Sequence, residues 1–305
     1  MTERIERPKS PPERGEMSRS DRGGKRNEPE QRPLARDGNA VSREGTPSME
    51  RIASRGNPLI THIRKLVSLA SYQREQGAFV CDGPKLLKEA LLHGVAVQTV
   101  LYTDGAELPA LPESVRKVSV TPDIMGAVSP AKTPQGVLGV CAIPERPLPR
   151  KLDGRRYLVL DGLQDPGNVG TILRTADAFS ADGVFLLNGC AGLWRPKTVR
   201  ATMGAAFRVP AWNCGTAELS ALLKASGLPL YGAALRPDAK DVRDMELSRF
   251  AAAIGSEGNG LSQEVLSLCD SVFRIPMAAR CESLNAAIAA AVVLWEAARD
   301  AFPAP

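Results

Sequence analysis

The sequence predicts an α/β protein in which a small α/β domain precedes a larger one built on a mainly parallel sheet. Its 305 residues are enough for about two domains. From Lys151 onward, short apolar segments alternate with segments of helical periodicity, the pattern of strands joined by crossover helices. Several of the apolar segments are nearly continuous, as expected of strands that are covered on both faces.

The first 50 residues differ in composition from the rest of the chain. They hold 11 Lys and Arg and 10 Asp and Glu, but only 8 hydrophobic residues and no aromatic one. Such a segment cannot bury enough apolar surface to offset its conformational entropy. We therefore expect residues 1–50 to be a disordered tail. A basic arm that binds RNA is the alternative, although the net charge of +1 favours a solvated tail.

Residues 51–145 are expected to form the small α/β domain. Apolar side chains recur at helical spacing around residues 63–70 and over Pro84–His93, which predicts two helices. Short apolar segments predict strands at Phe79–Cys81, Thr99–Tyr102, Lys117–Val120 and Gly136–Cys141. The prolines of Ile143–Arg150 indicate a linker to the next domain.

Residues 151–305 are expected to form the second domain. Its predicted strands are Tyr157–Leu160, Val184–Leu187, Phe207–Val209, Leu230–Ala234, Ala251–Ile254 and Val272–Ile275, with helices between them. The last helix, Ala286–Arg299, is apolar almost all round, which is typical of a helix buried in a core or an oligomer contact. Ligand sites of parallel sheets lie at the carboxyl ends of the strands, so the loops there are the places to examine.

Composition argues against several classes of protein. The longest apolar run, Ala286–Trp295, has ten residues, too few to cross a membrane, and the N-terminus lacks the apolar core of a secretory signal. Six cysteines without a C-x-x-C pair argue against a zinc ribbon, and a cytoplasmic location is expected. Both histidines, His62 and His93, lie in the N-terminal half. The C-terminal half therefore cannot build a Ser-His-Asp triad or a histidine-ligated metal site from its own residues.

The first loop of interest runs from Leu160 to Gly170 and leads into a helix that ends near Phe179. Arg174 lies opposite the buried stripe of this helix, and Asn168 stands where an N-cap would be. One interpretation is a capped helix with a surface pair of Arg174 and Asp177. The other is an arginine near the positive end of a helix, facing a phosphate.

Two further loops carry unusual residues. Gly255–Gly260 has the spacing G-x-x-G-x-G, which fits neither a dinucleotide fold nor a Walker A loop, so NAD and ATP are poorly supported. Packing gives no reason for the carboxylate of Glu257 in its middle. After Pro276 come Ser283 and Asn285, both common at helix starts, just before the long apolar helix.

These three segments together resemble the SpoU branch of the SPOUT RNA methyltransferases over roughly residues 151–300. The resemblance is carried, in order, by Asp165–Ala176, Gly255–Ser262 and Ile275–Asn285. Residues 51–145 are similar to the L30e-like substrate-binding domain of that family. That similarity is carried by Asn57–Ile60, Phe79–Gly83 and Thr133–Val137.

The resemblance implies a C-terminal trefoil knot, S-adenosylmethionine as cofactor without a metal, and a homodimer. It implies 2'-O-methylation of a ribose in structured RNA, and the two-domain layout favours rRNA, in particular 23S rRNA, over tRNA. Three alternatives stay open: a tRNA 2'-O-methyltransferase, an rRNA methyltransferase of antibiotic resistance, and a non-catalytic RNA-binding assembly factor. Intact motifs argue against the last of these.

The resemblance also implies roles for single residues. Arg174 matches the catalytic arginine, and the other residues expected in the catalytic site are Asn168, Glu257, Ser283 and Asn285. The residues expected to bind the cofactor are Ala234, Leu235, Gly255, Gly260, Ile275, Met277 and Leu284. Lys197 and Arg200 match a basic stretch that contacts RNA, with an exposed pair as the alternative. Ala279 stands where the family usually has glycine.

Overall fold

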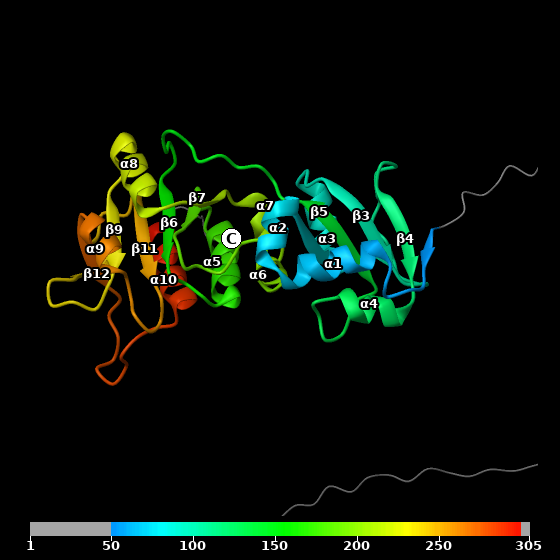
Figure 1. Ribbon diagram of the computed structural model, residues 1–305. Coiled ribbons are helices and arrows are strands. Elements are labelled where there is room, and N and C mark those ends of the chain that lie inside the picture. The colour runs from blue at the N-terminus through cyan, green and yellow to red at the C-terminus, as the bar shows by residue number, and fades with distance from the viewer. Residues whose placement is uncertain (1–49, 300–305) are drawn as a thin grey trace, which may run out of the picture. The chain divides into compact units, whose positions relative to one another are not determined.

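The computed structural model describes residues 50–299, so the tail expected at residues 1–50 lies, apart from Glu50, outside the described residues. Residues 51–142 contain a five-stranded mixed sheet with the strand order β1-β4-β3-β5-β2 (Figure 1). β5 pairs antiparallel with β2 and β3, and the other pairs are parallel. The strands are β1 (Arg51–Ile52), β2 (Ala78–Asp82), β3 (Val97–Tyr102), β4 (Arg116–Val120) and β5 (Val137–Ala142).

Helices cover both faces of this sheet. They are α1 (Pro58–Ser68), α2 (Ala70–Gln76), α3 (Pro84–Leu92) and α4 (Pro122–Val128). α1 and α4 pack on the face that carries Val80, whereas α3 packs on the face that carries Phe79 and Cys81. Alternate residues of a strand point to opposite faces, so α1 and α3 lie on opposite sides of the sheet.

The helix expected around residues 63–70 is in fact two helices. α1 ends at Ser68, Leu69 has extended backbone, and α2 begins at Ala70. The hydroxyl of Ser68 donates to the carbonyl of Arg64 at 2.8 Å. Such a bond from a serine side chain to the preceding turn competes with continued helix, which accounts for the break. The short elements β1, α2 and α4 were not predicted.

Residues 156–274 contain a seven-stranded sheet in which every pair is parallel, as the alternating pattern predicted. Its strand order is β10-β12-β9-β11-β6-β7-β8. The strands are β6 (Arg156–Asp161), β7 (Gly183–Leu186), β8 (Ala211–Asn213), β9 (Leu230–Ala233), β10 (Lys240–Asp241), β11 (Phe250–Gly255) and β12 (Ser271–Arg274). In this register Gly255 lies beside Asp161, so the loops that follow β6 and β11 start next to each other.

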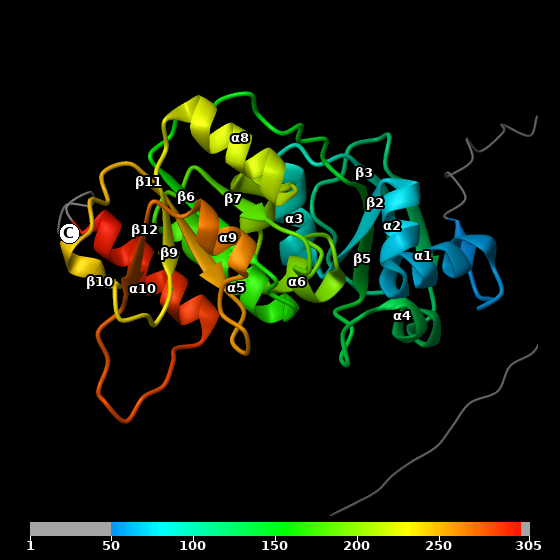
Figure 2. The same ribbon diagram turned by 60° about the vertical axis from the view of Figure 1, so that its left-hand side comes forward.

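The helices of this part divide between the two faces of the sheet (Figure 2). They are α5 (Pro166–Ala178), α6 (Pro196–Ala201), α7 (Ala205–Arg208), α8 (Thr216–Ser226), α9 (Gln263–Leu268) and α10 (Ala286–Ala298). α5 and α10 share one hydrophobic cluster with Leu158 and Leu160 of β6, and α8 and α9 share another with Tyr157 and Val159. No helix within residues 50–299 is long and apolar enough to cross a bilayer.

The strand predicted at Phe207–Val209 is wrong. Phe207 lies in the short helix α7, which starts after Gly204 with φ +94°, and the strand β8 follows Pro210. The ring of Phe207 packs against the rings of Phe79 and Trp194, with centroids 6.2 and 6.5 Å apart. A short apolar run is compatible with either a strand or a buried turn of helix, and only the long-range packing decides between them.

The long apolar helix α10 is only partly buried. Ala290, Val293 and Leu294 have no exposed surface, but Ile288 and Trp295 keep 52% and 58% of theirs. The Trp295 ring meets Phe179, at the end of α5, edge to face with centroids 5.9 Å apart. One side of α10 therefore remains apolar and uncovered by the described residues.

Candidate functional site

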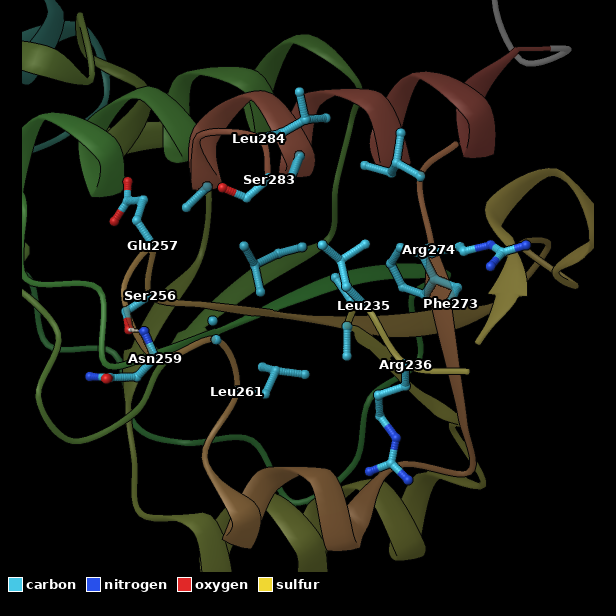
Figure 3. Close-up of a pocket in the computed structure, with 18 of the residues that line it drawn as sticks. Leu235, Arg236, Ser256, Glu257, Asn259, Leu261, Phe273, Arg274, Ser283 and Leu284 are labelled. Atoms are coloured by element: carbon cyan, nitrogen blue, oxygen red, sulfur yellow. Dashed lines mark hydrogen bonds between the residues drawn. The ribbon is translucent and has the colours of Figure 1, made fainter. Parts of the chain in front are cut away.

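A cavity of about 360 Å³ lies at the carboxyl ends of β9, β11 and β12 (Figure 3). The parallel register brings these strand ends together, because β9 pairs with both β11 and β12. All seven residues that the sequence suggested for cofactor binding line it: Ala234, Leu235, Gly255, Gly260, Ile275, Met277 and Leu284. The segments at the ends of β9, β11 and β12 are far apart in sequence, yet they surround one cavity.

The lining is mostly apolar and partly main chain. Leu235, Leu261 and Phe273 contribute apolar side chains. Gly255 and Gly260 have no side chain, so they contribute main-chain atoms to the wall. A concave apolar site with a few polar groups is typical of a small-molecule pocket.

The glycine loop between β11 and α9 is a tight turn. Ser256 and Gly260 exchange two main-chain hydrogen bonds, 3.1 and 2.9 Å long, and Gly260 has φ +65°. A Cβ atom on Gly255 would lie within 3.0 Å of the main chain of Gly260 and Leu261. Position 255 therefore accepts no side chain unless the loop moves. The turn presents Glu257 at the edge of the cavity (Figure 3).

Three polar side chains meet beside this edge. The amide of Asn168 donates to Oε1 of Glu257, and Nδ2 of Asn285 donates to the same atom at 3.2 Å. Nδ2 of Asn285 also lies 3.1 Å from Oδ1 of Asn168. The oxygen of Asn285 accepts from the main-chain N–H groups of Ala287 and Ile288, so Asn285 is the N-cap of α10. Because the cap takes the oxygen, the amide nitrogen faces Asn168 and Glu257.

The sequence suggested Asn168 as the N-cap of α5, but Asn168 does not cap this helix. Asp165 is the cap: its Oδ1 accepts from the main-chain N–H of Asn168 at 2.9 Å. Pro166 explains the shift, because proline favours the first position of a helix and the cap then precedes it. The side chain of Asn168 is left free to reach Glu257. The N–H of Asn168, together with Lys197 at 3.3 Å, lowers the pKa of Asp165.

Ser283 lines the cavity (Figure 3), whereas Arg174 does not. Arg174 is exposed on α5 and makes no ion pair with any other described residue. Its proposed surface partner, Asp177, instead accepts from Nε and Nη2 of Arg208 at 2.9 and 2.8 Å. The pairing suggested between Arg174 and Asp177 is therefore wrong, because a guanidinium from the neighbouring helix α7 takes the carboxylate.

Other lining residues had no role in the sequence analysis. Arg236 and Arg274 lie on the side of the cavity opposite Glu257 (Figure 3), and Asn259 lies in the glycine loop. All three follow or end a strand, so the rule that sites lie at strand carboxyl ends was the signal that could have found them. Ala279, the departure from the family pattern, is exposed and does not line the cavity. Residues 50–299 contain no cluster of three or more His, Cys, Asp or Glu that could hold a metal ion.

Comparison with known proteins agrees with this geometry. Residues 155–295 match the model of the SpoU rRNA Methylase family, and residues 57–139 match the MRM3-like substrate binding domain. The chain is 32% identical, over 248 residues, to the 23S rRNA (guanosine(2553)-2'-O)-methyltransferase RlmP of Bacillus subtilis, covering 81% of this chain and 98% of that protein. It is also 32% identical to the 23S rRNA (uridine(2479)-2'-O)-methyltransferase of Streptomyces viridochromogenes, covering 84% and 94%.

Two solved structures of methyltransferases are also similar to this chain. The AdoMet-bound rRNA methyltransferase from Sinorhizobium meliloti superposes with a TM-score of 0.75 at 29% identity, covering 84% of this chain and 99% of that one. The SpoU methyltransferase AviRb from Streptomyces viridochromogenes, in complex with AdoMet, gives 0.74 at 28% identity, covering 80% and 98%. Fold, cavity and sequence identity lead to one conclusion: the chain belongs to the SpoU rRNA methylase family.

Proposed function

We propose that this protein transfers a methyl group from S-adenosylmethionine to the 2'-oxygen of a ribose in 23S rRNA. One observation carries the proposal: Glu257 both lines the cavity and accepts hydrogen bonds from Asn168 and Asn285. A polar cluster that can hold a hydroxyl group thus stands at the edge of a cavity that suits a nucleoside. The two relatives named above are 23S rRNA 2'-O-methyltransferases.

The cavity fits S-adenosylmethionine. Its volume of about 360 Å³ lies in the range of small-molecule sites, roughly 300–1,000 Å³. Apolar side chains suit the faces of an adenine ring, and the bare main chain at Gly255 suits its edge. The residues that would hold the cofactor are Ala234, Leu235, Gly255, Gly260, Ile275, Met277 and Leu284. When bound, the cofactor supplies a methyl group activated by a sulfonium.

The chain's own residues would position the nucleophile. Oε1 of Glu257 accepts from two amides, while Oε2 has no hydrogen-bond partner among the described residues. Oε2 can therefore accept a hydrogen bond from the ribose 2'-hydroxyl and fix its direction, which is a large part of catalysis when no covalent intermediate is needed. We assign Ser283 and Asn285 to the same site. Arg174, always charged, would stabilise negative charge on the hydroxyl oxygen and bind a phosphate.

We also propose the finer features that the family implies. Residues 51–145 would be an L30e-like RNA-binding domain, residues 151–305 the methyltransferase domain, and the C-terminal segment would thread a trefoil knot. The separate sheets of the two parts and the match of residues 57–139 to a substrate-binding domain support the division. The cytoplasm, where rRNA is made in bacteria, would be the location.

Mapping of ribose methylation tests the function. Total RNA from wild-type and deletion strains should differ at one 23S rRNA nucleotide, and the purified protein should restore it with S-adenosylmethionine, with or without EDTA. Calorimetry should detect binding of S-adenosylmethionine and S-adenosylhomocysteine. Binding of NADH or ATP instead would reject the proposal. A change confined to tRNA would favour the tRNA enzyme, and tight rRNA binding without methylation would favour an assembly factor.

We further expect a homodimer that uses the uncovered side of α10. Ile288 and Trp295 are more than half exposed, and burying such side chains between two copies would stabilise a two-fold contact. Light scattering should give about twice the chain mass of 32.6 kDa. Ile288→Asp should shift the protein toward monomer. Leu92→Asp, at a leucine of α3 that is 65% exposed, should not. An active wild-type monomer at micromolar concentration would contradict this expectation.

A further inference from the structure

A second cavity, of about 450 Å³, lies between α1 and the end of α4. It shares no residue with the cavity described above. Its polar lining residues are Thr61, Arg64, Lys65, Ser68 and Ser129, and we call it the α1–α4 pocket. Two cationic residues and three hydroxyl-bearing residues therefore line one space.

Acidic groups near the α1–α4 pocket are already engaged. Arg64 and Lys65 are exposed and form no salt bridge with another residue in the described range. Asp123, on α4, pairs with Arg55, and Asp82, beneath Ser129, accepts from the Ser129 hydroxyl at 3.2 Å. Every charged side chain in the lining is positive. Such a set can bind a tetrahedral oxyanion, because ammonium and guanidinium groups donate hydrogen bonds to its oxygens. The hydroxyls of Ser68 and Ser129 already donate to the Arg64 carbonyl and to Asp82, so the two cations and the Thr61 hydroxyl are the donors that remain.

Helix α6 connects this pocket to the candidate site. Nη2 of Arg195 donates to the carbonyl of Ser68 at 3.1 Å, and its Nη1 is buried with no acceptor among the described residues. Arg200 reaches the carbonyl of Pro130 at 3.4 Å, just beyond Ser129. Lys197 reaches Asp165, the cap of α5. α6 accordingly lies between α5 and the helices of the N-terminal part (Figure 2).

We propose that the α1–α4 pocket binds a backbone phosphate of the substrate RNA, and that the cations of α6 continue this contact toward Asn168. The proposal rests on the proposed function, since it names how that substrate is held. The pocket would add affinity and fix the position of the strand without reading its sequence, because phosphates are the same at every nucleotide. An acidic peptide is the other polyanion that could use these groups, and the test separates the two.

A pair of double variants tests the pocket. Arg64→Ala with Lys65→Ala removes two charges from it. Lys85→Ala with Lys88→Ala removes two exposed charges from α3, on the opposite face of the same sheet, and serves as the control. Binding of a 23S rRNA fragment is measured at several salt concentrations, together with S-adenosylmethionine binding, thermal stability and single-turnover methylation.

The pocket variant should bind the RNA about tenfold more weakly, and the slope of log K against log salt should fall by about 0.7–0.9 for each phosphate that the variant no longer neutralises. Its S-adenosylmethionine affinity, its melting temperature and its rate at saturating RNA should match wild type. Arg64→Lys, which keeps the charge, should retain the wild-type slope. The α3 variant should behave as wild type.

Three results would overturn the proposal. They are an unchanged salt slope in the pocket variant, an equal loss of RNA affinity in the α3 variant, and a pocket variant that binds RNA normally but loses affinity for poly-glutamate. RNA binding is measured without methylation. Failure of the wild type to methylate rRNA would therefore count against the proposed function, and an unchanged slope would count against the pocket alone.

Discussion

Replacing Arg174 with alanine should lower the single-turnover rate of methyl transfer by about a hundredfold or more, while S-adenosylmethionine affinity stays near wild type. The expected loss follows from the role assigned to the guanidinium, which is to stabilise the developing negative charge on the ribose oxygen. The fold should be unaffected, because Arg174 is exposed and pairs with no carboxylate in residues 50–299. A surface change of this kind alters stability by about 0.5 kcal/mol at most.

Two further variants make this result specific. Arg174→Lys should not restore the rate, since lysine lacks the planar fork that can contact a phosphate and a hydroxyl together. Lys224→Ala is the matched control, because Lys224 is an exposed cation on α8, across the sheet from α5. Asp177→Ala is unsuitable as a control, because it would break the ion pair of Asp177 with Arg208, which also pairs with Glu89. An Arg174→Ala rate within a few-fold of wild type would remove Arg174 from the catalytic site.

Gly255→Ala should weaken S-adenosylmethionine binding by about ten- to a hundredfold, the equivalent of roughly 1–3 kcal/mol of steric strain. The added methyl group would meet the main chain of Gly260 and Leu261, which cannot rotate away as a side chain could. The loop must then open the Ser256–Gly260 pair and carry Glu257 out of place. Calorimetry measures the affinity, and thermal denaturation measures the accompanying loss of stability.

Gly258→Ala is the control for this substitution. It adds the same methyl group to the same loop, but at Gly258 no atom lies within 4 Å of the new Cβ. Its affinity for the cofactor should stay near wild type. If the two variants bind S-adenosylmethionine equally well, the close approach at position 255 does not shape the cavity, and the glycine has another role.

The parts of this fold with a local signal could be predicted from the sequence. Continuous apolar runs located β6 and β11, and the apolar helix from Ala286 was found with its capping residue Asn285. The residues around the cavity were assigned from the resemblance of three segments to the SpoU pattern. All three segments lie at or after the carboxyl ends of strands in one parallel sheet, where ligand sites are expected.

Contacts between distant segments had no such signal. The bond between Asn168 and Glu257 joins residues 89 apart, and Arg208 reaches Asp177 across 31 residues. Neither periodicity nor propensity specifies which side chains meet across helices. The same holds for Phe207, whose helix is stabilised by rings from another part of the chain. In each of these cases tertiary packing determined the structure. For Phe207 it overrode the local sequence pattern, and for the two side-chain contacts the local pattern gave no indication.

The double engagement of Asn285 has a consequence for how the site opens. One side of its amide holds the first turn of α10, and the other side holds Asn168 and Glu257. Fraying of that turn would therefore also release Asn285 from Asn168 and Glu257, which couples local unfolding of the helix end to the polar cluster. Because the groups share a partner, substitutions at these three positions act as one cooperative unit, and their energetic effects do not add.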